Sequence, residues 1–102
     1  MGKNENTPSE KEWMIMEVLW ESGTSMTSSE IIMRLPQNCH MTHKMARVLL
    51  NRLCQKGIVG YEQDSQDLRV YHYHALKGKE ECLKKRADIL LIVIFKEMKA
   101  VP

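Results

Sequence analysis

The sequence predicts a mostly α-helical fold that contains one small β-hairpin. Two capping boxes each precede a short apolar pattern, and a third apolar pattern at helical spacing ends at Gly57. Two segments rich in β-formers then flank a polar turn at residues 64–67. With 102 residues, the chain has the size of one domain with a single core.

The first helix is expected to begin after Ser9, which forms a capping box with Glu12, and to end at the Ser22-Gly23 breaker. The residues on its apolar arc are Trp13, Ile15, Met16, Leu19 and Trp20. Met14 and Val18 lie outside that arc, so they are expected either to meet a second surface, such as a partner subunit, or to be exposed. The i, i+7 spacing of the two tryptophans favours core or dimer packing over stacking on bases.

A second, shorter helix is expected after Thr27, which forms a capping box with Glu30. Pro36 forbids its continuation, so it spans about two turns. Ser25 and Met26, just ahead of it, could add a short edge strand.

The third helix is the clearest, running from about Thr42 to Lys56 before the stop at Gly57. Its buried stripe is predicted to be Ala46, Leu49, Leu50 and Leu53. The opposite face carries Lys44, Arg47, Val48, Asn51, Arg52 and Gln55. No aspartate or glutamate occurs from Ile31 to Tyr61. A basic segment of this kind is suited to a phosphate backbone.

A hairpin is expected next, with strands at Ile58 to Gln63 and Leu68 to Leu76. In the second strand Arg69, Tyr71 and Tyr73 alternate with Val70, His72 and His74. From about Lys79 a last helix carries Leu83, Ala87, Leu90, Leu91, Ile94 and Met98 at helical spacing. The run Ile89 to Phe95 could also be a buried strand, but its flanks are helix formers, which favours the helix.

This order of elements is that of a winged helix-turn-helix, with residues 1–8 as a flexible N-terminus, 9–76 as the DNA-binding domain and 77–102 as a C-terminal dimerisation helix. Double-stranded operator DNA is the expected partner of a homodimer. The residues expected to contact DNA are Thr42, His43, Lys44, Arg47, Val48, Asn51, Arg52 and Arg69. Those expected to form the dimer are Leu83, Ala87, Leu90, Leu91, Ile94, Phe95 and Met98. The alternative is a protein-interaction module that binds its partner through the hydrophobic last helix.

Several motifs together resemble the penicillinase repressor family, the BlaI/MecI/CopY type, over about Ser9 to Phe95. They are Glu12-Trp13-x-x-Met16-x-x-Leu19-Trp20, Ser29-Glu30-Ile31-Ile32, Leu49-Leu50-Asn51-Arg52-Leu53-x-x-Lys56-Gly57, Tyr71-x-Tyr73 and Glu81-x-Leu83-Lys84-Lys85. The resemblance implies a dimeric repressor of a palindromic operator, released through a sensor protease or, in the copper branch, by copper. Met45 and Val48 stand where the family commonly has threonine. No C-x-C cluster is present, so copper sensing is not expected, and no residue identifies a sensor protease.

Other classes of protein are not favoured. The longest apolar run has seven residues, which is too few to cross a bilayer, so membrane insertion is not expected. The protein is expected to be cytoplasmic. Cys39, Cys54 and Cys82 are widely spaced and expected to be reduced. Cys39 with His40 and His43 lacks the second ligand pair of a zinc site, and Cys54 has no evident base. Neither a metal, a cofactor nor an enzymatic activity is therefore expected.

Overall fold

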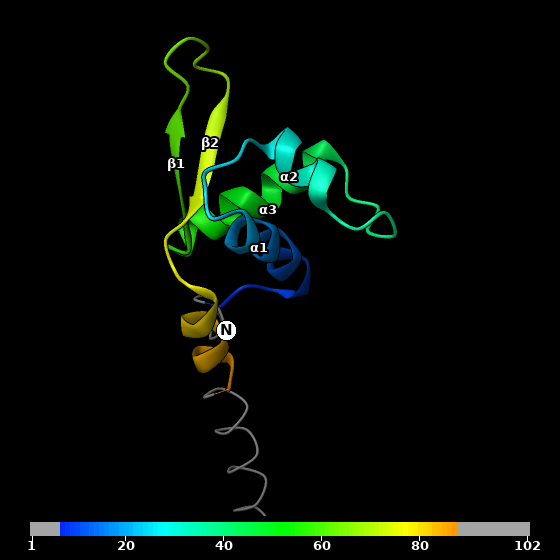
Figure 1. The fold of residues 1–102 in the computed structure, drawn as a ribbon, viewed down its shortest axis with the longest axis vertical. Helices are drawn as coiled ribbons and strands as arrows, with labels where there is room; N and C mark the ends of the chain where they lie inside the picture. The colour runs from blue at the N-terminus through cyan, green and yellow to red at the C-terminus, as the bar shows by residue number, and fades with distance from the viewer. Residues whose placement is uncertain (1–6, 88–102) are drawn as a thin grey trace, which may run out of the picture.

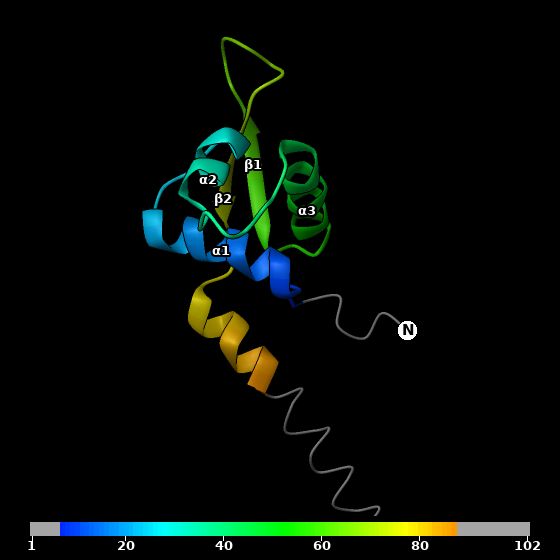
Figure 2. The ribbon, with the colours of Figure 1, turned by 90° about the vertical axis from the view of Figure 1, so that its right-hand side faces the viewer.

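The computed structural model describes residues 7–87. In chain order the elements are α1 (Glu10–Ser22), α2 (Ser28–Arg34), α3 (His43–Gln55), β1 (Val59–Gln63) and β2 (Tyr71–Ala75), and residues 79–87 are also helical. Figure 1 shows the three labelled helices packed beside the base of the hairpin, whose tip extends away from them. Residues 79–87 lie at the opposite end of the molecule from that tip (Figures 1 and 2). The predicted winged helix-turn-helix is confirmed.

Both predicted capping boxes are present. The Oγ atom of Ser9 accepts a hydrogen bond from the Glu12 N–H at 3.3 Å, and the Glu12 carboxylate accepts from the Ser9 N–H at 2.9 Å. Thr27 and Glu30 repeat this reciprocal pair at 3.2 and 2.9 Å. Such a pair satisfies backbone donors that the first turn of a helix leaves free, which explains why both helices begin where the sequence predicts.

The core lies between the three helices and the base of the hairpin. Its largest fully buried apolar side chains are Ile15, Met16, Ile31, Leu50, Leu53, Ile58 and Val59. The predicted stripe of α3 is buried, which confirms the orientation of this helix. Each large apolar side chain buried in this way contributes about 1.5 to 3 kcal/mol, so the core fixes which face of α3 remains in solvent.

Val18 meets a second surface, as the sequence predicts, but this surface belongs to its own chain and not to a partner subunit. This residue is buried in the chain's own core, and Met14 is half-buried, with its sulfur 3.8 Å from Sγ of Cys39. The reason is that α2, α3 and β2 all pack against α1, so its buried surface is wider than one arc. Val18 is therefore not available to a partner subunit.

The hairpin is a two-stranded antiparallel sheet in which Tyr61 pairs with Tyr73 and Val59 with Ala75. Met26 forms an isolated bridge to Tyr73, with N–H to O distances of 2.8 Å in both directions. The expected edge strand is thus reduced to one bridging residue, which ties the segment before α2 to the hairpin.

The second strand is shorter than predicted, because Leu68 and Arg69 belong to the turn. The Asp64 carboxylate accepts hydrogen bonds from the N–H groups of Gln66 and Asp67, both at 3.0 Å. An aspartate that binds the backbone two and three residues ahead stabilises a turn in place of a strand ladder. Strand pairing therefore begins only at Tyr71.

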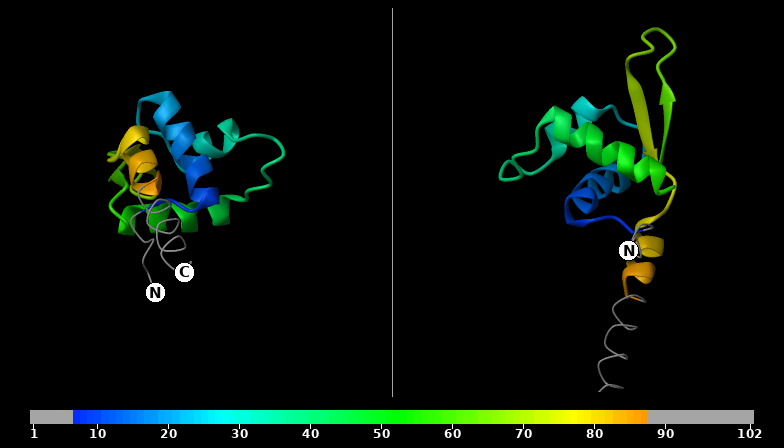
Figure 3. Two further views of the ribbon diagram at one scale, coloured as in Figure 1. Left: turned by 90° about the horizontal axis from the view of Figure 1, so that it is seen from below. Right: turned by 180° about the vertical axis from the view of Figure 1, so that it is seen from behind.

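The last helix docks against α1 through contacts between distant parts of the chain. The Trp20 Nε1–H donates to the Lys77 carbonyl at 2.8 Å, just before this helix begins. The guanidinium of Arg86 lies 4.8 Å from the centre of the Trp13 ring. Figure 3 shows residues 79–87 beside α1 when the molecule is seen from below. Trp13 thus contacts the chain's own last helix, and Trp20 binds the segment just before it.

One side of this last helix remains in solvent. Cys82 is buried, whereas Leu83 is 45 % exposed and Ala87 is also exposed. The other residues expected to form the dimer, which are Leu90, Leu91, Ile94, Phe95 and Met98, lie outside the described residues. Among residues 7–87 no helix is long and apolar enough to span a membrane.

Candidate nucleic-acid interface

The outer face of α3 is a continuous exposed surface. It consists of His43, Lys44, Arg47, Val48, Asn51, Arg52 and Gln55, all exposed. We call this set the α3 face. The side chains of Arg47, Asn51 and Arg52 make no hydrogen bond or ion pair with another of residues 7–87, so their donors are available to an external partner. The apolar member, Val48, is 44 % exposed.

Thr42 and His43 stand at the start of α3. Thr42 is the N-cap, and its Oγ1 accepts a hydrogen bond from the Met45 N–H at 3.1 Å. Because a hydroxyl both accepts and donates, the Thr42 O–H can still donate to a phosphate oxygen. The first turn of α3 has no acidic residue, so the free N–H groups and positive end of the helix dipole are not neutralised there.

Lys56 does not belong to the α3 face. Its Nζ atom lies 2.6 Å from the Glu12 carboxylate and donates to the Thr7 carbonyl at 3.0 Å. The side chain of Glu12 is 1 % exposed and that of Lys56 is 19 % exposed. This lysine of the basic segment therefore connects the end of α3 to the start of α1.

Arg69 lies in the turn of the hairpin, on a different element from the other expected contacts. Its guanidinium binds the Asp67 carboxylate at 3.1 and 3.3 Å and is 90 % exposed. The hydrogen bonds from Arg69 hold the pKa of Asp67 below its usual value. Arg69 can thus offer its remaining donors to a phosphate, but with its charge partly neutralised.

Three tyrosines on the hairpin were not among the predicted contacts. The rings of Tyr61 and Tyr71 stack with centres 4.9 Å apart, and both lie within 6.2 Å of the ring of Tyr73. Tyr73 is buried and Tyr61 is half exposed. Burial raises the pKa of Tyr73, whereas the positive charge of Arg47 acts to lower it. The alternation of residues along the second strand predicts that Tyr71 and Tyr73 share one face, but it does not predict that this face lies next to α3.

The other candidate chemistries find no support among residues 7–87. No group of three or more histidine, cysteine, aspartate or glutamate side chains there is arranged to hold a metal ion, and this includes Cys39, His40 and His43. Burial raises the pKa of Cys54, which keeps it a neutral thiol.

The model of the penicillinase repressor family matches residues 8–101. The chain belongs to the penicillinase repressor family. This confirms the resemblance of the sequence motifs and, together with the fold, makes the protein a winged-helix DNA-binding repressor by class, not a member of an enzyme family.

Three solved structures have a similar fold. The DNA-binding domain of the repressor BlaI is 25 % identical, with a TM-score of 0.59 over 72 % of this chain and 84 % of that chain. FabT of Streptococcus pneumoniae, solved in complex with DNA, is 22 % identical, with a TM-score of 0.56 over 92 % of this chain and 62 % of that one. The adhesin competence repressor AdcR of Streptococcus pyogenes is 13 % identical, with a TM-score of 0.53 over 99 % and 72 %. A search of curated proteins gives no significant match.

Proposed function

We propose that this penicillinase repressor family member binds a palindromic operator as a homodimer, with the α3 face in the major groove and the hairpin beside it. One observation carries the proposal: the face of α3 opposite the core is basic, lacks acidic side chains and makes no internal polar contacts through Arg47, Asn51 or Arg52. An exposed face of this kind can exchange hydration for contacts with base edges and phosphates.

The residue types on the α3 face suit different parts of DNA. Arg47 and Arg52 can each form a bidentate pair with a guanine edge, and Asn51 can pair with adenine. Lys44 and Thr42, nearer the start of α3, suit phosphate oxygens. Val48 offers an apolar contact for a thymine methyl group. His43 and Arg69 complete the proposed contacts, Arg69 from the hairpin turn.

The dimer is proposed to form through the last helix. Its Cys82 side faces the rest of the chain, while Leu83 and Ala87 point away from residues 7–87 into solvent. A second copy of the chain, related by a twofold axis, would cover these side chains and place two α3 helices on one side of the DNA. The half-sites would then be centred about 10 base pairs apart or a multiple of this.

Selection from a random duplex library with the full chain tests the proposal. The expected result is enrichment of an inverted repeat, to which Arg47→Ala binds about 10 to 100 times more weakly than the wild type. Lys84→Ala is the matched control, because this lysine is exposed on the last helix and outside the α3 face. Enrichment of no sequence, or equal loss of affinity in both variants, would overturn the proposal.

A further inference from the structure

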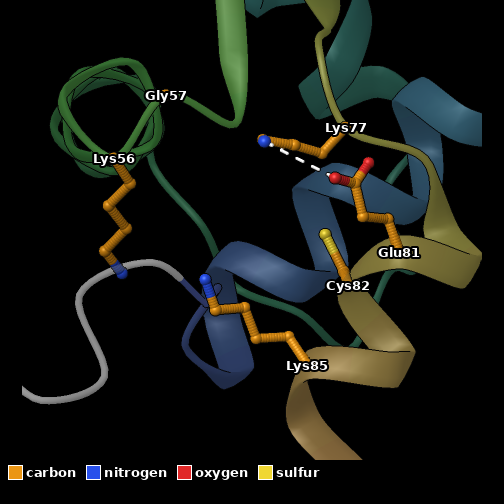
Figure 4. Close-up of a pocket in the computed structure, with 6 residues that line it drawn as sticks. All are labelled: Lys56, Gly57, Lys77, Glu81, Cys82 and Lys85. Atoms are coloured by element: carbon orange, nitrogen blue, oxygen red, sulfur yellow. Dashed lines mark hydrogen bonds and ion pairs between the residues drawn. The ribbon is translucent and has the colours of Figure 1, made fainter.

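A pocket lies where the end of α3 meets the last helix. Its volume is about 260 Å³, and it is lined by Lys56, Gly57, Lys77, Glu81, Cys82 and Lys85. Figure 4 shows the lysines entering from three elements: the end of α3, the segment after β2 and the last helix. The pocket is separate from the α3 face that we propose for DNA, since none of the residues of that face lines the pocket.

The three lysines differ in how far their charge is already compensated. Lys56 is held by Glu12 at 2.6 Å, and Lys77 lies 3.5 Å from the carboxylate of Glu81. Lys85 has no ion pair or hydrogen bond with any other of residues 7–87. The pocket therefore holds one uncompensated ammonium group, with two paired lysines beside it.

An ammonium group carries three donors, which sets the capacity of the pocket for hydrogen bonds. Two of those on Lys56 are used, by Glu12 and Thr7, and one on Lys77 is used by Glu81. Lys85 retains all three. The oxygens of an anion could thus accept bonds from Lys85 and Lys77 without breaking either existing pair.

Apart from the three lysines and Glu81, whose carboxylate is paired with Lys77, the walls of the pocket are weakly polar. Gly57 presents backbone without a side chain, and burial raises the pKa of the Cys82 thiol, which keeps it neutral. Together with the aliphatic stems of the lysines, these walls suit a short carbon body, while the charges suit one anionic group.

We propose that this pocket binds a small organic molecule with a single oxyanion group, a carboxylate or a phosphate monoester. The anion lies on Lys85 and Lys77, and its carbon body lies against Gly57 and Cys82. Because the walls come from the end of α3 and from the last helix, the bound molecule connects the two. The proposal does not depend on DNA binding.

Titration of the full chain without DNA tests this proposal. NMR monitors the backbone amide signals of Gly57 and Cys82 during the titration. Butyrate is the carboxylate probe, methyl phosphate the phosphate probe and butyramide the uncharged match. We expect saturable shifts with at least one of the two anions and none with butyramide. The anion that saturates at the lower concentration identifies the headgroup.

Two lysine variants locate the binding. Lys85→Gln is expected to raise the dissociation constant about tenfold, since it removes hydrogen bonds from a charged donor. Lys84→Gln makes the same change one residue earlier, outside the pocket, and should leave binding unchanged. No saturable shift with either anion, equal shifts with butyramide, or equal weakening in both variants would overturn the proposal.

Discussion

The ammonium group of Lys56 lies 2.6 Å from the buried carboxylate of Glu12, and this ion pair joins the C-terminal end of α3 to the first turn of α1. The same carboxylate accepts the Ser9 N–H at 2.9 Å, so it caps α1 as well. One glutamate therefore fixes both the start of α1 and the end of the helix that presents the α3 face.

Lys56→Met is expected to lower the free energy of unfolding by about 2 to 4 kcal/mol, because it leaves a buried carboxylate without its cation. Urea unfolding at pH 7 measures the change, with Lys11→Met, an exposed site on α1, as the control. The double variant Glu12→Gln, Lys56→Met should lose less than the single one, since no charge is left unpaired. A loss no larger than that of Lys11→Met would show that the ion pair is not needed.

The turn of the hairpin should show a dependence on acid that comes from Asp64. The hydrogen bond from His72, then those from the Gln66 and Asp67 amides, lower the pKa of Asp64 below its usual value of 3.8. A carboxylate whose pKa is lowered by folding stabilises the fold above pH 3.8, and this stabilisation is lost as the pH falls through the lower, folded value.

Asp64→Asn should therefore unfold at a lower temperature than the wild type at pH 7, and the difference should shrink at pH 3. Thermal unfolding at the two pH values measures it. Glu21→Gln, an exposed substitution on α1, is the control. A difference that stays the same at pH 3 would mean that the Asp64 carboxylate does not titrate as described.

Features of the fold that depend on neighbouring residues can be predicted from the sequence. Ser9 with Glu12, and Thr27 with Glu30, act across three positions, so the starts of α1 and α2 can be read directly. The orientation of α3 can be predicted from the spacing of its apolar residues, because they all lie on one side of the helix. The α3 face is the opposite, exposed side of the same helix.

Contacts across long stretches of chain could not be predicted in this way. Lys56 and Glu12 are 44 positions apart, and nothing local distinguishes this lysine from one that meets phosphate. Val18 is buried because other elements pack on a second side of α1, which helical periodicity does not report. The second strand is shorter than its sequence pattern predicts, because the carboxylate of Asp64 binds backbone that a strand would otherwise use.

Trp20→Phe should loosen the last helix. It removes the Nε1–H that binds the Lys77 carbonyl at 2.8 Å, a hydrogen bond of about 0.5 to 1.5 kcal/mol. Hydrogen exchange should become faster at the Cys82 amide, which binds the Gly78 carbonyl, and remain unchanged at Leu50 in the core. Trp13→Phe, which keeps an aromatic ring beneath Arg86, should have a smaller effect. Equal exchange in the wild type and Trp20→Phe would contradict the docking role of this indole.

The proposed dimer predicts that Leu83→Glu combined with Ala87→Glu shifts the full chain toward monomer. Both positions are exposed within residues 7–87, so charges there should cost little in the monomer but should repel across a twofold axis. Sedimentation over a range of protein concentrations measures the change, with Lys84→Glu as the control. A wild-type chain that is monomeric at micromolar concentration, or a variant that dimerises as strongly, would rule out assembly through this surface.

The salt dependence of duplex binding by the full chain tests whether the α3 face binds DNA. The logarithm of the binding constant is expected to fall linearly with the logarithm of salt concentration, with a slope of about −0.9 for each phosphate contact. Lys44→Ala should make this slope shallower by about one contact, while Lys84→Ala should not change it. Absence of duplex binding at low salt would show that the α3 face does not bind DNA and would favour a module that binds only protein.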